Sequence, residues 1–206
     1  MKPENFKIIL WDFDGVIIES NSVREAGFRE VLKSFPNDQI EALIDYHNLN
    51  GGLSRYVKFR YFYEHIRKET ITSKEVDELA FHFSEIMMKL LINPDLLITP
   101  VINFLHDQFN TGKIMHIVSG SDQIELRELC KSLSIDSLFH SINGSPTHKS
   151  KLVRTIIESN KYDKSNYCLI GDSINDFDAA MDNDITFFGY NNINLMDKGS
   201  YFIPSI

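Results

Sequence analysis

Two aspartates, Asp12 and Asp14, directly follow the apolar run 8–11 and stand just before Gly15. A short apolar run that ends at such a turn signal is typical of a buried strand of a parallel sheet. Alternation along that strand would send both carboxylates to the same side, where their charges repel. A divalent cation would relieve the repulsion, and Mg²⁺ prefers carboxylate, water and phosphate oxygens as ligands. The pair therefore indicates either a metal-assisted phosphate site or an ordinary solvated acidic turn.

Polar groups also follow two later apolar runs. Ser119 and Gly120 come after the run 113–118, and Asp172 comes just after the run 167–170. Strands that alternate with helices form a parallel sheet covered by helices on both faces. Ligands of such sheets bind beyond the carboxyl ends of the strands. We therefore expect an α/β fold, a Rossmann-like doubly wound parallel sheet, with all three polar motifs at one edge.

Residues 19–93 interrupt this pattern with helical periodicity and no strand pattern. We expect two domains: an α/β catalytic core formed by 1–18 and 94–206, and a small all-helical cap formed by 19–93. An insert at this point of the chain would cover the ligand edge of the sheet as a lid, with hinges near 17–20 and 93–97. The expected helices are 23–35, 40–49, 53–67 and 74–91 in the cap, and 100–109, one ending at 133, 149–159 and 176–181 in the core; the expected strands are 8–11, 113–118, 139–142, 167–170, 185–188 and a short edge strand at 201–203.

Composition narrows the class of protein. The 206 residues carry a formal net charge of −8, which argues against nucleic acid as an electrostatically held partner. No stretch approaches the ~20 apolar residues of a membrane span, and the start of the chain has no signal-peptide pattern. Cys130 and Cys168 lie in apolar segments, which indicates buried free thiols in a reducing compartment. We expect a cytoplasmic protein with no membrane partner, and the oligomeric state, monomer or dimer, stays open.

Four short motifs carry the polar residues in a fixed order along the chain: DFDG at 12–15, SGS at 119–121, HKSKL at 148–152 and GDSIND at 171–176. This order resembles the haloacid dehalogenase-like superfamily, in the branch with a small helical cap that includes phosphoglycolate phosphatases and β-phosphoglucomutases. The resemblance implies phosphoryl transfer rather than dehalogenation. True dehalogenases usually lack the second aspartate of the first motif, because a halide leaving group needs no proton.

The resemblance also implies a role for each motif residue. Asp12 would be the nucleophile that becomes phosphorylated, and Asp14 the general acid and base. The Ser119 hydroxyl and the Gly120 amide would bind the phosphoryl group. Lys149 would pair with Asp12 and with the phosphoryl oxygens, and so neutralise the charge that develops on them.

The third motif offers two lysines. We assign Lys149 rather than Lys151, because the motif lysine of the family is usually followed three residues later by an aliphatic residue. Leu152 follows Lys149 at that spacing. Lys151 is expected to be a surface lysine near the start of a helix.

The resemblance implies Mg²⁺ as the cofactor. Asp12, Asp172 and the backbone carbonyl of Asp14 would bind it, and Asp176 would orient the site, either as a ligand or through water. Asp178 is expected on the helix surface. The alternative for this motif is an acidic loop without a metal.

The cap carries the candidate substrate residues. Its segment 51–55, GGLSR, resembles the Gly-x-Ser-Arg stretch of β-phosphoglucomutase-like proteins, in which the arginine holds the non-reacting phosphate. Arg55 would do the same here, since an arginine fork suits phosphate or carboxylate. Arg24 would lie at the substrate entrance. The alternative is that Arg55, Lys58 and Arg60 form a solvated helix face.

These observations favour a Mg²⁺-dependent phosphatase that acts on a small phosphorylated metabolite, a sugar phosphate or phosphoglycolate-like compound, through an aspartyl-phosphate. A phosphosugar mutase of the β-phosphoglucomutase type is the first alternative. The histidine that such mutases carry after the first motif falls near Arg24 in this chain, which favours hydrolysis. A catalytically silent member used for binding or regulation is the second alternative.

Overall fold

A six-stranded parallel sheet forms the core of the computed structural model, which describes residues 1–196, 198 and 201–203. The strand order is β3-β2-β1-β4-β5-β6, so β1 lies centrally and the chain winds outward from it in both directions. The predicted α/β, Rossmann-like fold is confirmed. The strands are β1 (Ile8–Trp11), β2 (Ile114–Asp122), β3 (Ser141–Ser145), β4 (Tyr167–Gly171), β5 (Thr186–Tyr190) and β6 (Tyr201–Ile203).

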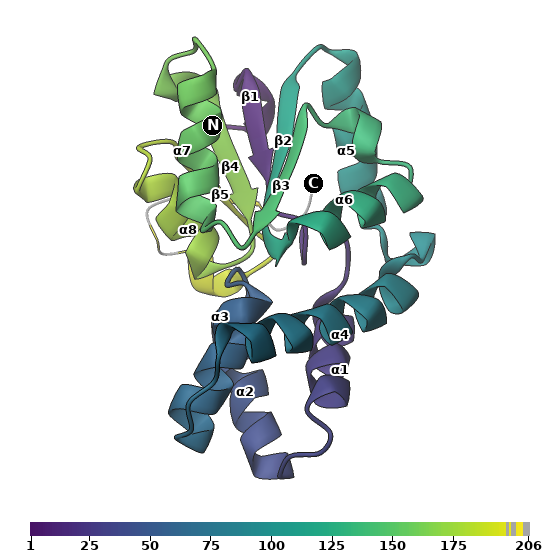
Figure 1. The fold of residues 1–206 in the computed structure, drawn as a ribbon. Coiled ribbons are helices and arrows are strands. Elements are labelled where there is room, and N and C mark those ends of the chain that lie inside the picture. The colour runs from purple at the N-terminus through teal and green to yellow at the C-terminus, as the bar shows by residue number, and fades with distance from the viewer. Residues whose placement is uncertain (197, 199–200, 204–206) are drawn as a thin grey trace.

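Side chains of β1 alternate between two apolar layers. Ile9 and Trp11 pack with α5 and α6 on one face, and Ile8 and Leu10 pack with α7 and α8 on the other. Figure 1 shows these two helix pairs on opposite sides of the sheet. All four β1 side chains are fully buried, as expected for the central strand of a parallel sheet. The helices are α5 (Thr99–Asn110), α6 (Gln123–Ser132), α7 (Lys149–Ser159) and α8 (Ile174–Met181).

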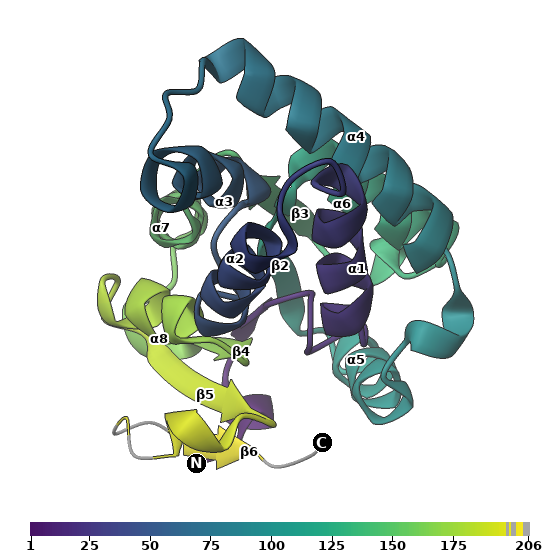
Figure 2. The ribbon, with the colours of Figure 1, turned by 90° about the horizontal axis from the view of Figure 1, so that it is seen from below.

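The chain between β1 and α5 forms an all-helical cap below the carboxyl ends of the strands (Figure 1). Seen from below, α1, α2 and α3 lie in front of the strand ends, and α4 passes along one side (Figure 2). Thr72 and Glu75 form a capping box that starts the longest helix, α4. The cap helices are α1 (Asn21–Val31), α2 (Asn37–Leu49), α3 (Arg55–Tyr61) and α4 (Ser73–Leu91), and a π-helical segment, Phe62–Arg67, follows α3 where the sequence predicted one continuous helix.

Two adjacent segments join the cap to the core. The Ile98 amide donates to the Ile17 carbonyl at 3.0 Å, and the Glu19 amide donates to the Leu96 carbonyl at 2.8 Å. An antiparallel bridge between Ile18 and Leu97 lies between these two bonds. The two crossings therefore form one short paired ribbon, at the places where the sequence predicted hinges.

Two strands differ from the prediction by more than two residues at one end. β2 was expected to end at Val118, but it continues to Asp122 through a register irregularity and pairs there with Ser145. β3 begins at Ser141 rather than Phe139 and consists mainly of small polar residues. Pairing with a neighbouring strand extends both segments beyond what local propensity indicates. Within the described residues, no helix is both long and apolar enough to cross a membrane.

Candidate active site

The end of β1 brings Asp12 to the start of α7. The Asp12 amide donates to the Ile170 carbonyl at 2.9 Å, which continues the sheet pairing by one residue. Its Oδ1 lies 2.9 Å from Nζ of Lys149, the first residue of α7. Lys149 also pairs with Asp176, while Lys151 is exposed. The lysine beside the predicted nucleophile is therefore Lys149, which is buried and only 4% exposed.

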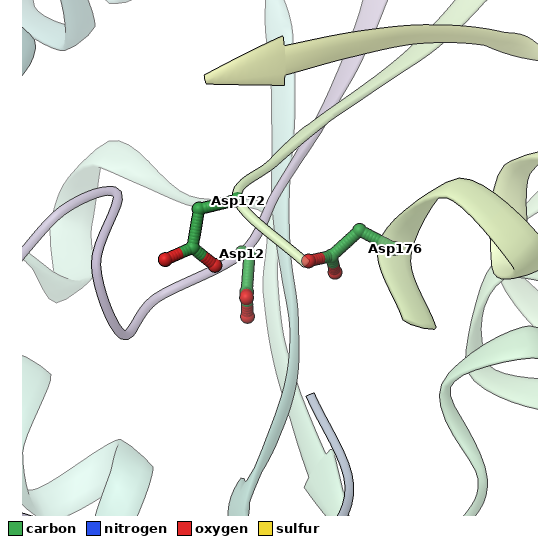
Figure 3. Close-up of side chains that lie close together, drawn as sticks. All are labelled: Asp12, Asp172 and Asp176. Carbon is green, nitrogen blue, oxygen red and sulfur yellow. The ribbon is translucent and has the colours of Figure 1, made fainter. Parts of the chain in front are cut away.

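Three carboxylates converge at this edge of the sheet (Figure 3). Asp12, Asp172 and Asp176 each offer one oxygen, and these oxygens lie within 4.8 Å of one another. Asp172 follows β4, and Asp176 lies in the first turn of α8, where its Oδ2 accepts from the Ser173 amide at 3.1 Å and from the Ser173 hydroxyl at 2.5 Å. The capping box of α8 thus fixes one member of the cluster. Asp178 lies on the exposed side of the same helix.

The electrostatics of this cluster fit a bound cation. Burial and the neighbouring Asp176 raise the pKa of Asp12 well above its ordinary value, and the same two causes raise the pKa of Asp172 to about 7. Burial would lower the pKa of Lys149, but Asp12 and Asp176 together hold it above its usual value. One lysine does not offset three clustered carboxylates. Their oxygen donors suit a hard divalent cation.

Asp14 is not one of the three carboxylates whose oxygens lie within 4.8 Å of one another, although it lines the same cavity as Asp12. β1 ends at Trp11, and alternation no longer applies at Asp14. The Asp14 carboxylate faces the cap and accepts from the Ser20 hydroxyl at 2.5 Å, from Arg24 Nε at 2.9 Å and from the Ser121 hydroxyl at 2.5 Å. Burial would raise the pKa of Asp14, but Arg24 and these hydroxyls hold it well below its ordinary value.

Gly15 is required at the turn between these two aspartates and the cap. Its φ of +74° is a left-handed conformation that side chains disfavour. A Cβ at Gly15 would also lie 2.1 Å from Oδ2 of Asp172. The turn and the acidic cluster therefore fit together only with glycine at this position.

The end of β2 carries the predicted phosphate-binding residues. Ser119 is 1% exposed, and its hydroxyl accepts from the Ser121 amide at 3.1 Å. Gly120 lies directly against the cap, because a Cβ there would lie 2.3 Å from the Gly52 carbonyl oxygen. This contact places a cap loop immediately against the edge of the sheet.

A cavity of about 590 Å³ lies between cap and core. From the core it is lined by Asp12, Asp14, Ser119, Gly120 and Asp172. From the cap it is lined by Arg24, His47, Arg55 and Lys58, among others. The predicted catalytic, phosphate-binding and cap residues thus meet around one cavity, except Lys149 and Asp176, which do not line it; Lys149 contacts both Asp12 and Asp176.

A family model for haloacid dehalogenase-like hydrolases matches residues 9–190. The chain belongs to this family. A comparison with the sequences of curated proteins gives no match.

Solved structures of similar fold cover nearly the whole hydrolase. A mutant of CbbY from Rhodobacter sphaeroides, in complex with xylulose-(1,5)bisphosphate, is 13% identical with a TM-score of 0.78, over 97% of this chain and 94% of that one. β-Phosphoglucomutase from Clostridium difficile is 15% identical with a TM-score of 0.77, over 97% and 91%. A predicted phosphoglycolate phosphatase from Haemophilus somnus is 17% identical with a TM-score of 0.73, over 97% and 94%. At these identities the likeness concerns the fold.

The two cap arginines that line the cavity, Arg24 and Arg55, are buried in ion pairs. Arg24 Nη1 lies 2.5 Å from Glu125 Oε1, and Arg55 contacts both oxygens of Glu125 at 2.5 and 2.9 Å. Arg55 also donates to the Ser84 hydroxyl at 2.6 Å. The alternative of a solvated basic face is wrong for Arg55 and Lys58, which are 4% and 2% exposed. Of the three helix cations considered for that face, only Arg60 reaches solvent, with 41% of its side chain exposed.

Sequence reasoning missed three residues of this site, Glu125, Ser121 and His47, and considered Lys58 only as part of a solvated helix face. Glu125 lies in the first turn of a helix, where an acid normally serves the helix dipole. Ser121 belongs to a motif in which only the first serine was assigned a role. His47 and Lys58 lie on different cap helices, and nothing local in the sequence pairs them. The one available signal was an acid, Glu125, six residues after the predicted phosphate-binding residue Ser119.

Proposed function

We propose that this hydrolase is a Mg²⁺-dependent phosphatase that hydrolyses a small phosphorylated metabolite through an aspartyl-phosphate. The observation that carries the proposal is the buried pair of Asp12 and Lys149 at the core end of the cavity. A carboxylate held 2.9 Å from an ammonium and beside two further carboxylates is suited to attack on phosphorus rather than to structure alone.

The metal would be held by the acidic cluster of Asp12, Asp172 and Asp176, together with the backbone carbonyl of Asp14. When bound, Mg²⁺ would neutralise part of the negative charge of the carboxylates and of the phosphoryl oxygens. Asp176 and Lys149 already bond to each other, so this pair orients the site from the side of α7 and α8.

In the first half of the reaction, an Asp12 oxygen forms a bond to phosphorus and the bond from phosphorus to the ester oxygen breaks. Asp14 gives a proton to the leaving oxygen. The Ser119 hydroxyl and the Gly120 amide donate to the phosphoryl oxygens, and Lys149 offsets the charge that develops on them.

In the second half, water attacks the same phosphorus and gives its proton to Asp14. The bond between phosphorus and Asp12 breaks, which releases inorganic phosphate and restores the carboxylate. Arg24 donates to both Asp14 oxygens, at 2.9 and 3.4 Å. Asp14 must carry a proton to act as the acid, so this cap arginine has to move away before the first half.

The experiment is a screen of phosphorylated metabolites with Mg²⁺, in which released phosphate is measured. We expect Asp12→Asn to reduce release at least about 10³-fold, because the nucleophile is lost. Asp178→Asn is the matched control, since Asp178 is an exposed acid near the same motif. Equal turnover by wild type and Asp12→Asn would refute the proposal. Isomerisation of a sugar phosphate without phosphate release would instead favour the mutase, and no turnover by the wild type would favour a binding role.

A further inference from the structure

Lys58 is a buried cation in the wall of the cavity. It lies on α3 of the cap and is 2% exposed. Its Nζ donates to Nδ1 of His47 at 2.7 Å and to the Gly51 carbonyl at 3.1 Å. An ammonium has three donors, so these two bonds leave one without a partner among the described residues.

The other buried cations of this cavity region all have carboxylate partners. Arg24 pairs with Asp14 and Glu125, and Arg55 with Glu125. The third, Lys149, pairs with two aspartates. Lys58 forms no ion pair within the part of the chain that the structure describes.

His47 is a hydrogen-bond partner of Lys58 but not a counter-ion. Burial and the neighbouring Lys58 lower the pKa of His47 to about 3, so its ring is neutral near pH 7. Its Nδ1 then accepts from Lys58, which places the ring proton on Nε2. Burial also lowers the pKa of Lys58 to about 7, although the charge of Asp14 opposes this effect. An ammonium buried without a counter-ion is costly, and a bound anion would remove that cost.

The arginine that the sequence suggested for this task is already engaged. Both oxygens of Glu125 contact Arg55, and the Ser84 hydroxyl accepts from it as well. Its guanidinium also lies over the Phe83 ring, 4.6 Å from the ring centroid. The charge of Arg55 is thus paired with a carboxylate, whereas that of Lys58 is not, within the part of the chain that the structure describes.

We propose that Lys58, oriented by His47, is the specificity-determining residue that binds an anionic group at the non-reacting end of the substrate. The inference rests on the proposed function, since it takes the phosphoryl group to lie at Asp12. The anionic group is a carboxylate or a second phosphate. Lys58 thereby discriminates against phosphate esters whose non-reacting end is uncharged.

Three phosphonate probes of matched chain length test this assignment by calorimetry with Mg²⁺, without turnover: propylphosphonate, 3-phosphonopropionate and propane-1,3-bisphosphonate. We expect the wild type to bind at least one anionic-ended probe about tenfold or more tightly than propylphosphonate, and the tighter of the two identifies carboxylate or phosphate. Lys58→Met should abolish that preference and leave the affinity for propylphosphonate within about twofold.

Two further variants keep the test decisive. Lys58→Arg retains the charge and should retain a preference for an anionic end, which guards against loss of folding in Lys58→Met. Arg60→Met removes a partly exposed cation from the same helix and should change nothing. Equal binding of all three probes by the wild type, or an equal loss for all three in Lys58→Met, would overturn the assignment. Failure of the proposed function appears separately, as unchanged turnover in Asp12→Asn.

Discussion

Glu125 of the core and Arg55 of the cap form a two-point ion pair, with Oε2 to Nη1 at 2.5 Å and Oε1 to Nη2 at 2.9 Å. The same carboxylate binds Arg24 from a second cap helix. Burial would raise the pKa of Glu125, but the two arginines hold it below its ordinary value. One core carboxylate therefore ties two cap helices to the core in the closed arrangement.

Removal of this charge should destabilise the protein. Breaking a buried ion pair by changing one partner typically costs about 3–5 kcal/mol, because the other charge stays buried. We expect Glu125→Gln to lower the free energy of unfolding by about 3 kcal/mol in urea titrations at pH 7.5. Glu128→Gln is the matched control, since Glu128 lies on the exposed side of the same helix. Similar unfolding midpoints for both variants would show that the ion pair does not hold the cap.

Lys149 and Lys151 offer a second matched pair, two residues apart at the start of α7. Lys149 contacts Asp12 and Asp176, whereas Lys151 is exposed. Removal of a cation that offsets charge in the transition state typically costs 10²–10³-fold in rate. We expect Lys149→Met to lower kcat/KM by about that factor on the best substrate from the phosphate-release screen, and Lys151→Met to lower it by less than about twofold. If the two variants lose activity equally, the assignment of the motif lysine is wrong.

The position of Asp12, Lys149 and Asp172 at one edge follows from rules that the sequence displays. Each residue follows or precedes a recognisable strand or helix, and the carboxyl ends of parallel strands lie at the same edge of a sheet. Asp176 follows from the capping box that begins at Ser173. These placements required only local patterns and one topological rule.

The contacts between cap and core could not be predicted in that way. Arg24 and Glu125 are 101 residues apart along the chain, and each alone looks like an ordinary helix charge. Their burial depends on how closely the cap approaches the sheet. The close contact between Gly52 and Gly120 reflects this distance. The partners of Asp14 could not be predicted for a related reason, because they come from the cap and from β2 rather than from β1.

Alanine variants at Gly15 and Gly112 distinguish the effect of backbone strain from the effect of damage to the acidic cluster. Their φ angles are +74° and +76°, so alanine at either position costs about 1–2 kcal/mol of backbone strain. Only at Gly15 would the new Cβ collide with Asp172; nothing lies within 4 Å of it at Gly112. We expect Gly15→Ala to lose at least as much stability as Gly112→Ala, and only Gly15→Ala to weaken Mg²⁺ binding, by at least about tenfold in calorimetry. Equal Mg²⁺ affinity in the two variants would separate Gly15 from the metal site.

His47 should make the protein less stable in mild acid. Its pKa in the folded protein is about 3, compared with 6.5 as the ordinary value, because of burial and the neighbouring Lys58. Between these two pH values the unfolded chain binds a proton that the folded protein does not bind, so stability falls as pH decreases below 6.5. By pH 5 the loss that His47 causes should reach about 2 kcal/mol, since each unit of pH is worth at most about 1.4 kcal/mol.

The test compares urea unfolding of the wild type, His47→Gln and His106→Gln at pH 7.5, 6 and 5. Glutamine can still accept from Lys58 but does not titrate, so His47→Gln should lose about 2 kcal/mol less than the wild type between pH 7.5 and 5. His116 contributes in the same pH range, because burial lowers its pKa to about 4, but it is present in all three proteins and cancels in the comparison. His106 is exposed, and His106→Gln should follow the wild type. Parallel pH dependence of all three proteins would mean that His47 is not held neutral beside Lys58.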